Sequence, residues 1–205
     1  APGLAAELRQ CGIGRLAPAP WCADAFLVEA ALGHSLPHLA GEVYFQEITS
    51  TLPVEALRAA LLDLAGDAVE PGGFRVLDLC AAPGSKATQL GLWLQDTARD
   101  GGSGLLVANE PNDQRAQVLR QNVIRAGLTN CLLTRLDGRL VGALAPEIFD
   151  AVLVDAPCSG EGNVRKDPSA LEAWCDAEGH ARALEAQATR QQELLESGWR
   201  ALRPG

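Results

Sequence analysis

The nine residues that decide the fold are Asp78-Leu79-Cys80-Ala81-Ala82-Pro83-Gly84-Ser85-Lys86. They follow a short apolar strand predicted at Val76–Leu79 and begin a helix predicted from Gly84 to Gln95. Ligands of open α/β sheets bind at this carboxyl end of a strand. Gly84 lets the backbone approach a ligand closely, and free amides at the helix start suit a carboxylate. The stretch therefore predicts a ligand-binding loop, and it does not match the G-x-G-x-x-G pattern of dinucleotide enzymes.

The chain beyond this loop alternates between strands and helices. Three more buried strands are predicted, at Leu105–Ala108, Cys131–Thr134 and Ala151–Val154. This alternation is typical of a parallel sheet with crossover helices. The sequence therefore predicts the α/β class, with a doubly wound, mostly parallel sheet.

Two further helices are predicted after the first. One runs from an Asn112 cap to Ala126, with Gly127 as its C′ residue. The other covers 182–202 and presents its apolar residues Leu195, Trp199 and Leu202 on one face.

Residues 1–70 are predicted to form a partial N-terminal extension that contains a helix near 52–64. Pro71-Gly72-Gly73 marks the boundary, so residues 71–205 are predicted to be the ligand-binding domain. Four strands are fewer than a doubly wound sheet normally has. The chain contains no methionine and ends on Arg203-Pro204-Gly205. We therefore expect a fragment that lacks the last strands of its domain.

Composition narrows the class of protein. Of the 205 residues, 47% are hydrophobic, which supports a packed core, and no apolar run approaches the roughly 20 residues of a membrane span. We expect a soluble, cytoplasmic protein. The six cysteines show no C-x-x-C spacing, so neither a zinc site nor a disulfide framework is predicted. The net charge of −9 argues against a surface that attracts nucleic acid over its whole area, and leaves a local basic face open.

Each predicted strand has an acidic residue near or just after its end. Glu110, Asp137 and Asp155 come after the second, third and fourth strands, as Asp78 does near the end of the first. An acid in the position of Glu110 can bind both hydroxyls of a ribose, and Asp137 can accept from an adenine amine. S-adenosylmethionine carries a sulfonium and an ammonium beside its carboxylate. A rim of carboxylates with helix-start amides fits that charge pattern and fits a phosphate-rich dinucleotide badly.

The fourth acid begins a second motif, Asp155-Ala156-Pro157-Cys158-Ser159-Gly160-Glu161-Gly162. Cysteine at this place points to methylation of carbon, because carbon 5 of cytosine becomes nucleophilic only after a thiolate adds at carbon 6. A nearby acid that engages N3 assists the addition. Asp155 and Cys158 are therefore the predicted catalytic residues.

Residues 77–86 and 154–168 resemble the adenosylmethionine loop and the Pro-Cys motif of the RsmB/Nop/Sun family of RNA cytosine-C5 methyltransferases. Within that family, Ala108-Asn109-Glu110, Asp137-Gly138-Arg139 and Val164-Arg165-Lys166-Asp167-Pro168 are most similar to the bacterial RsmF type, which modifies small-subunit (16S) ribosomal RNA. Pro20-Trp21-Cys22 and Tyr44-Phe45-Gln46-Glu47 are similar to the segment before that type's catalytic domain. The resemblance covers roughly residues 20 to 205 and implies a Rossmann-like fold that binds S-adenosyl-L-methionine.

The resemblance also implies roles for single residues. The cofactor contacts that it implies are Cys80, Ala81, Ala82, Pro83, Gly84, Ser85, Lys86, Glu110, Asp137 and Asp155. In this family the attacking thiol lies in a Thr-Cys motif on the next strand, expected just after Gly205, and the Pro-Cys cysteine helps to release the product. This chain would then bind cofactor without completing turnover, unless Cys158 itself attacks. Arg165, Lys166 and Arg139 are the predicted contacts to substrate RNA, or else a solvated basic patch.

Three alternatives stay open at this point. A tRNA cytosine-C5 methyltransferase would use the same chemistry. A non-catalytic module that binds cofactor or serves as an RNA scaffold would lack the Thr-Cys pair downstream. A dinucleotide oxidoreductase is disfavoured by the 78–86 loop and by Cys158.

Overall fold

The computed structural model of the protein describes residues 8, 10, 16–28, 35–65, 73–97, 104–158 and 177–204. The elements follow in the order β1 (Leu16–Ala19), β2 (Cys22–Val28), α2 (Leu36–Leu39), the 3-10 helix η1 (Ile48–Thr51), α3 (Leu52–Ala65), β3 (Arg75–Asp78), α4 (Ser85–Thr97), β4 (Leu105–Asn109), α5 (Asp113–Arg125), β5 (Cys131–Thr134), α6 (Gly138–Leu144), β6 (Ala151–Leu153) and α7 (Ala177–Ala201). None of the described helices combines the length and hydrophobicity that a bilayer span requires.

The central sheet has four parallel strands in the order β5-β4-β3-β6. Leu77 of β3 lies opposite Val107 of β4 on one side and Val152 of β6 on the other. The chain moves outward from β3 through β4 to β5, then returns to add β6 on the other side of β3. This reversal places a topological switch point between β3 and β6, where open α/β sheets bind their ligands. The doubly wound, Rossmann-like sheet that the sequence predicts is confirmed.

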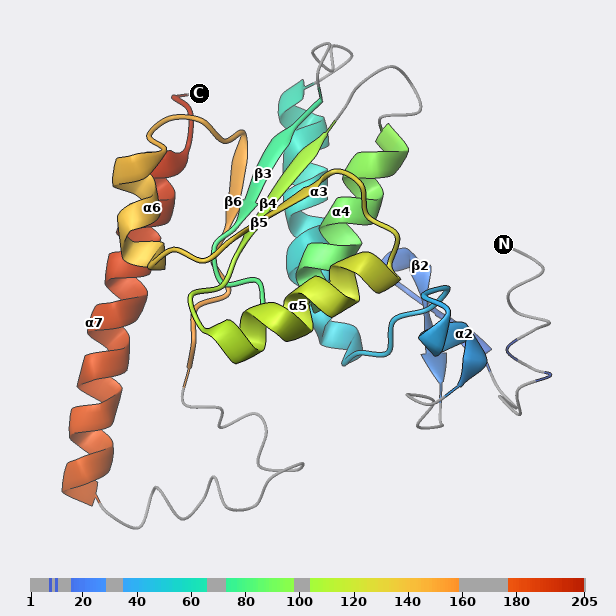
Figure 1. Ribbon diagram of the computed structural model, residues 1–205, viewed down its shortest axis with the longest axis horizontal. Helices are drawn as coiled ribbons and strands as arrows, with labels where there is room; N and C mark the ends of the chain where they lie inside the picture. Colours follow the sequence, from blue (N-terminus) through green and yellow to red (C-terminus); the bar gives the residue numbers. More distant parts are fainter. Residues whose placement is uncertain are drawn as a thin grey trace.

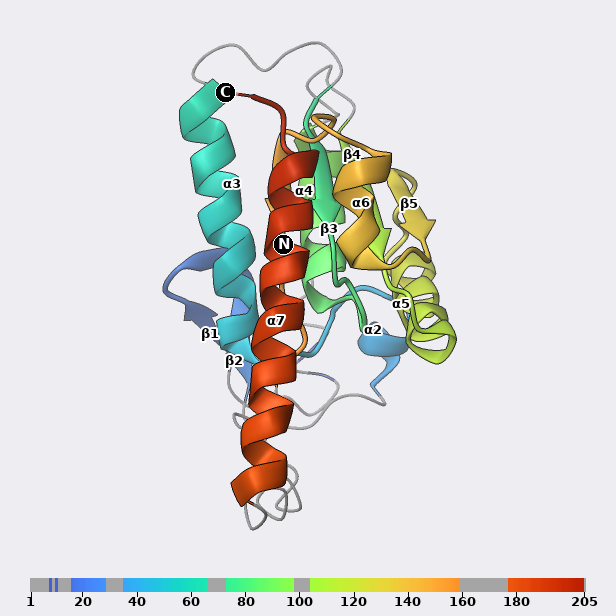
Figure 2. The same ribbon diagram turned by 90° about the vertical axis from the view of Figure 1, so that its left-hand side faces the viewer.

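Helices cover both faces of this sheet, as Figure 1 shows. Helices α3, α4 and α5 share one buried apolar cluster with Val76 of β3, whereas α6 and α7 share a second cluster with Leu77 and Leu79. Successive side chains of a strand point to opposite faces, which is why neighbours in β3 join different clusters. Figure 2 shows α6 and α7 side by side in front of the sheet. Because both faces are covered, the strand ends are left as the place for a ligand.

The predicted elements agree well with the observed ones. The four sheet strands lie within one residue of their predicted bounds, and α5 has the predicted caps, with the Asn112 side chain accepting from the Arg115 amide at 3.1 Å. Gly127 has a φ of +70°, as expected of a C′ glycine. The sequence pattern missed α6 and the antiparallel β1–β2 hairpin.

The last helix is longer than predicted and packs through a different face. It begins at Ala177, five residues before the predicted start at 182, and ends at Ala201. Leu195 and Trp199 are 61% and 75% exposed, while Leu194, Ser197 and Ala201 are buried. The packed face combines Leu194 with the small residues Ser197 and Ala201, and α6 and α7 approach closely: a Cβ on Gly142 would lie 2.2 Å from the Ser197 carbonyl oxygen. Large apolar side chains are therefore a poor guide to this interface.

The β1–β2 hairpin is attached to α3 and η1 by polar contacts. The indole Nε1 of Trp21 donates to Thr51 Oγ1 at 3.0 Å, and the buried thiol of Cys22 donates to Glu55 Oε1 at 3.3 Å. Helix α3 itself contributes Val54 and Leu61 to the core that contains β3.

Candidate active site

The acids predicted at the strand ends fall into a buried pair and an exposed pair. Asp78 and Glu110 are 1% and 2% exposed, at the ends of β3 and β4. The side chains of Asp137 and Asp155 are 39% and 56% exposed, after β5 and β6. Because the strands are parallel, all four residues follow carboxyl ends at one edge of the sheet.

The loop between β3 and α4 is fixed by the strands on both sides. The Leu79 amide donates to the Leu153 carbonyl and the Ala81 amide to the Asn109 carbonyl, each at 2.9 Å. Ala81 and Ala82 are buried, Cys80, Ser85 and Lys86 are half-buried, and Pro83 is exposed. The peptide bond between Ala82 and Pro83 is cis. The two hydrogen bonds to the neighbouring strands thus set the path of the loop toward α4.

Gly84 is required by its backbone and by its surroundings. Its φ is +113°, a conformation that residues with a side chain rarely adopt. A Cβ there would lie 3.1 Å from Leu119 Cδ1 and 3.4 Å from Asn122 Cβ, both on α5. Its carbonyl accepts from the Thr88 amide at 2.8 Å, so α4 starts at once. The first amides of α4 are therefore presented at the loop, as the sequence predicts.

Three polar residues that the sequence pattern did not single out hold this region together. Asn109 is fully buried and joins strand ends: its amide donates to the carbonyls of Leu79 and Leu136, and its oxygen accepts from Thr134 Oγ1 and the Leu136 amide. Arg115 Nη2 donates to the Ala82 carbonyl at 2.8 Å, and Asn122 Nδ2 donates to the Pro83 carbonyl at 2.7 Å. A polar residue inside an otherwise apolar strand was the available signal for Asn109.

Glu110 is held in one orientation. Its Oε1 accepts from the Asn112 amide at 2.9 Å, and its Oε2 lies 3.3 Å from Arg115 Nη1. Both contacts are charge-assisted and fix the carboxylate group at the end of β4.

Asp78 is the least satisfied group of the site. Neither of its carboxylate oxygens has a hydrogen-bond partner of normal geometry among the described residues. Burial raises its pKa to about 7; the Cys80 amide opposes this rise, the charge of Asp155 adds to it and Lys86 opposes it. A buried, unpartnered carboxylate costs free energy. The Asp78 carboxylate therefore suits a cofactor that carries positive charge and binds at the switch point of the sheet.

Lys86 and Asp155 join the two predicted motifs. Lys86 Nζ, in the first turn of α4, lies 2.7 Å from Asp155 Oδ2 at the end of β6. The two strands meet here at the switch point, so the ion pair connects the cofactor loop to the Pro-Cys segment. Cys158 is exposed, and Gln191 of α7 donates to the carbonyl of Pro157 next to it at 2.9 Å.

Three of the four thiols that the structure describes have a raised pKa, and the fourth, Cys158, is set apart by its exposure. Burial raises the pKa of Cys80 to about 12, with Asp78, Glu110 and Asp155 adding to the effect. Burial also raises the pKa of Cys131 to about 12 and that of Cys22. Cys158 is the exposed cysteine among the four described. Its location suits contact with a substrate better than that of the other three.

Asp137 and Arg139 are paired with each other. Asp137 is the N-cap of α6 and accepts from the Arg139 backbone amide at 3.0 Å. Side-chain and backbone hydrogen bonds from Arg139 lower the pKa of Asp137 to about 2. Arg139 also lies 3.3 Å from Glu193 of α7. Two carboxylates thus offset its charge. The other predicted RNA contacts, Arg165 and Lys166, lie outside the described residues.

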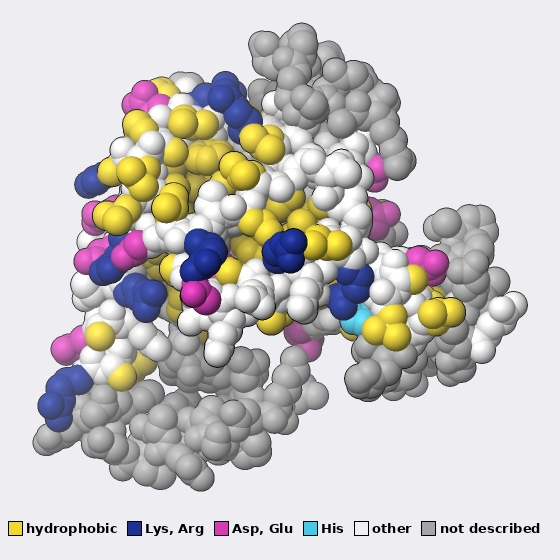
Figure 3. Space-filling view, in the orientation of Figure 1, with side chains coloured by type: hydrophobic (Ala, Val, Ile, Leu, Met, Phe, Trp, Pro, Cys, Tyr) yellow, Lys and Arg dark blue, Asp and Glu magenta, His cyan; other side chains and the backbone are white. Residues whose placement is uncertain are grey.

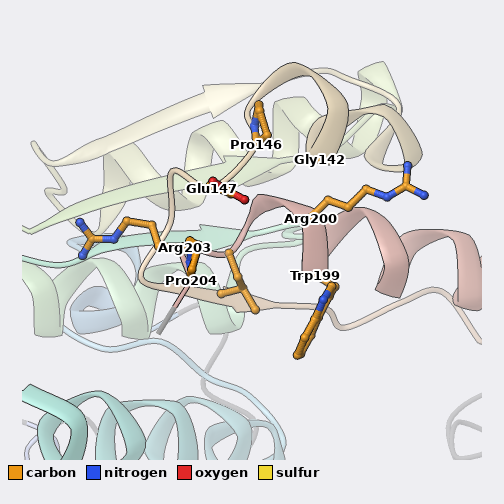
Figure 4. Close-up of a pocket in the computed structure, with 8 residues that line it drawn as sticks. Gly142, Pro146, Glu147, Trp199, Arg200, Arg203 and Pro204 are labelled. Atoms are coloured by element: carbon orange, nitrogen blue, oxygen red, sulfur yellow. The ribbon is translucent and has the colours of Figure 1, made fainter.

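A separate cleft of about 580 Å³ lies elsewhere on the molecule. Its lining comes from the end of α6, the segment before β6 and the end of α7: Gly142, Pro146, Glu147, Trp199, Arg200, Leu202, Arg203 and Pro204 (Figure 4). These segments lie at the amino end of β6, opposite the strand ends that carry the acids. Exposed hydrophobic side chains gather on the face over α6, where Leu140 and Leu144 are exposed (Figure 3). This cleft is therefore distinct from the predicted cofactor crevice.

Comparison with known proteins agrees with this geometry. Residues 61–205 match the family described as 16S rRNA methyltransferase RsmB/F. The chain is 47% identical, over 93% of its length, to ribosomal RNA small subunit methyltransferase F of Enterobacter sp. (strain 638), and 46% identical to that of Salmonella arizonae. It spans 37% of the length of these relatives. Among solved structures, a methyltransferase homologue from Pyrococcus horikoshii covers the whole chain with a TM-score of 0.69 at 26% identity, and the chain covers 57% of that structure.

Proposed function

The chain belongs to the RsmB/F family of 16S rRNA methyltransferases, and we propose that its protein methylates carbon 5 of a cytosine in small-subunit ribosomal RNA. The observation that carries this proposal is the ion pair between Lys86 and Asp155. It brings the loop proposed to bind cofactor and the Pro-Cys segment together at the switch point of the sheet. Such a protein would act on RNA in the cytoplasm.

The proposed methyl donor is S-adenosyl-L-methionine, whose sulfonium supplies the activated methyl group. The strand ends fit it because the buried Asp78 carboxylate accepts no hydrogen bond of normal geometry from the described residues, and the buried Glu110 carboxylate is held by an amide and a guanidinium. Residues 80–86, together with Glu110, Asp137 and Asp155, would hold it. Since Asp137 is already paired with Arg139, its contact with an adenine amine would use an oxygen that the guanidinium shares.

The proposed roles of Asp155 and Cys158 follow from the chemistry of cytosine. A cysteine thiolate adds to carbon 6 and forms a C–S bond, while an acid engages N3 and makes carbon 5 nucleophilic. After methylation, a base removes the carbon-5 proton and the C–S bond breaks. Asp155 is the proposed acid at N3. The family resemblance gives Cys158 the releasing role and places the attacking thiol in a Thr-Cys motif downstream.

The proposed partner is RNA, bound through local basic groups. Arg165 and Lys166 follow the Pro-Cys segment directly in the sequence. Arg139 would contribute less, because Asp137 and Glu193 already offset its charge. Phosphate contacts of this kind would make binding weaken as salt rises. We also propose that residues 1–70 act as an extension to a methyltransferase domain at 71–205.

Methyl transfer by the complete protein to small-subunit RNA tests the proposal. Asp155→Ala should abolish incorporation of labelled methyl groups. Cys158→Ala should leave a covalent protein–RNA adduct, seen as a shifted band on a denaturing gel, if Cys158 acts in release. Cys131→Ala, on β5, is the matched control and should retain activity without an adduct. Full activity of Asp155→Ala would refute the site, and loss of both activity and adduct in Cys158→Ala would make Cys158 the nucleophile.

A further inference from the structure

Asn122 of α5 lies at a junction of three segments that are distant in sequence. Its side chain is 9% exposed. Its Nδ2 donates to the Pro83 carbonyl at 2.7 Å, and its Oδ1 accepts from Arg125 Nη2 at 2.8 Å. Tyr44 Oη lies 3.4 Å from the same Nδ2. A carbonyl can only accept and a guanidinium can only donate, so the two strong contacts fix which way the amide points.

The carbonyl that Asn122 holds belongs to the loop proposed to bind cofactor. Pro83 precedes Gly84, whose φ of +113° turns the chain into α4. The position of a Cβ on Gly84 lies 3.4 Å from Asn122 Cβ, which shows that α5 touches the loop at this point. The loop conformation and the position of Asn122 are therefore coupled.

The segment before the sheet reaches the same junction. The Arg125 guanidinium lies 5.7 Å from the centre of the Tyr44 ring, a cation–π distance. The backbone of Gly41 packs so closely on Arg125 that a Cβ there would lie 1.8 Å from the Arg125 carbonyl oxygen. Arg125 is thus held by residues 41–44, and it in turn orients Asn122.

We infer that Asn122 is a positioning residue for the cofactor: its amide fixes the Pro83 carbonyl, and with it the backbone of residues 82–84 that faces the ligand. This inference rests on the proposed function, because it assumes that the loop binds S-adenosylmethionine. Arg125 and Tyr44 extend the same support to the N-terminal segment. Docking of residues 41–44 on α5 thereby helps to set cofactor affinity from outside the crevice.

The chain offers a matched control in Asn130. Its Nδ2 also donates to two backbone carbonyls, of Gly91 at 3.1 Å and Gly104 at 3.2 Å. These contacts connect α4 to the start of β4 and touch no residue of the 79–86 loop. Asn130→Asp and Asn122→Asp therefore remove the same donor from the same kind of contact. Asn122→Asp keeps the acceptor for Arg125.

The test is calorimetric titration of the 205-residue chain with S-adenosylmethionine, together with amide hydrogen exchange of the 79–86 segment. Asn122→Asp should weaken binding at least about tenfold, which is the loss of one well-placed contact, and should speed exchange in that segment. Asn130→Asp should bind within about twofold of the original chain and leave exchange in the segment unchanged. Equal losses in both variants, or original affinity in Asn122→Asp, would overturn the inference.

A second variant covers the case in which Asn122→Asp does not fold. Arg125→Met removes the guanidinium that orients Asn122 and keeps an apolar stem over Tyr44. It should weaken binding about threefold and speed exchange of the 79–86 segment; unchanged values would count against the inference. If the original chain binds no S-adenosylmethionine, the cofactor assignment of the proposed function fails, and the inference fails with it. Binding by the original chain with no effect of either variant would reject the inference alone.

Discussion

The loop after β3 and the segment after β6 lie beside each other, yet they are held very differently. The first is fixed by backbone hydrogen bonds to both neighbouring strands and by Arg115 and Asn122 of α5. The second, residues 154–158, has three exposed residues; Lys86 and Gln191 make polar side-chain contacts to it, and Val154 and Ala156 pack against the α6–α7 cluster. Binding sites are best built on rigid elements. The difference teaches that the half proposed to bind cofactor is fixed by backbone and side-chain hydrogen bonds, whereas the half proposed to carry the reactive residues leaves Asp155, Pro157 and Cys158 exposed.

The strongest test of the half proposed to bind cofactor is Gly84→Val. The variant must hold a β-branched side chain at φ +113° against Leu119, and such strain costs about 1–3 kcal/mol. We expect the free energy of unfolding to fall by about 2–3 kcal/mol in denaturant titration. Since the proposed cofactor site uses the same loop, we expect affinity for S-adenosylmethionine to fall by about a hundredfold, an equivalent free energy.

Gly127→Val serves as its control. Gly127 also has a positive φ, +70°, but a Cβ there would meet no atom within 4 Å. It should lose about 1 kcal/mol of stability for the left-handed backbone alone and keep its affinity for the cofactor. Equal losses of affinity in the two glycine variants would contradict the idea that the 79–86 loop is specially constrained.

The sequence predicted the parts of this architecture that depend on local pattern. The strand–turn–helix at 76–86, the cap at Asn112 and the turn at Gly127 each follow from residue types close together in the chain. The roles of Asn109, Arg115 and Asn122 could not be predicted, because each bonds to a carbonyl 27 to 39 residues away. The packed face of α7 was missed for a different reason. Its contact with Gly142 depends on small residues, which do not stand out in a pattern of hydrophobic side chains.

Asp78→Asn tests the loop after β3 through the pH dependence of the free energy of unfolding. Burial raises the pKa of Asp78 to about 7, so the folded chain holds a proton that the unfolded chain releases near pH 4. Stability of the original chain should therefore fall as pH rises from about 4 to about 7, and then level off. The amide does not titrate. We expect the variant to be equal in stability at pH 4 and more stable at pH 8 by up to about 4 kcal/mol, because a shift of about three pKa units is worth about 1.4 kcal/mol per unit.

Urea unfolding of both chains across this pH range makes the measurement. The stabilised variant should also bind S-adenosylmethionine more weakly, because it lacks the buried carboxylate proposed to lie near the positive charge of the cofactor. Such a gain of stability with loss of binding is the behaviour of a group kept for function. A variant that is less stable at pH 8 would instead mean that Asp78 has a partner that strengthens the fold.

The smallest effect is expected where the two halves meet, at Lys86 and Asp155. The side chain of Asp155 is 56% exposed, and exposed ion pairs contribute about 0.2–1 kcal/mol even at good distances. A double-mutant cycle of Lys86→Met and Asp155→Asn should therefore give a coupling energy of about 0.5 kcal/mol in unfolding, decreasing as salt screens the pair.

A coupling above about 2 kcal/mol, insensitive to salt, would show that the ion pair is shielded from solvent. The segment after β6 would then be held as firmly as the cofactor loop, and the contrast between a fixed and an exposed half would break down. A small, salt-dependent coupling would mean that an approaching substrate can free Asp155 from Lys86 at little cost, as the role proposed for Asp155 at a cytosine ring requires.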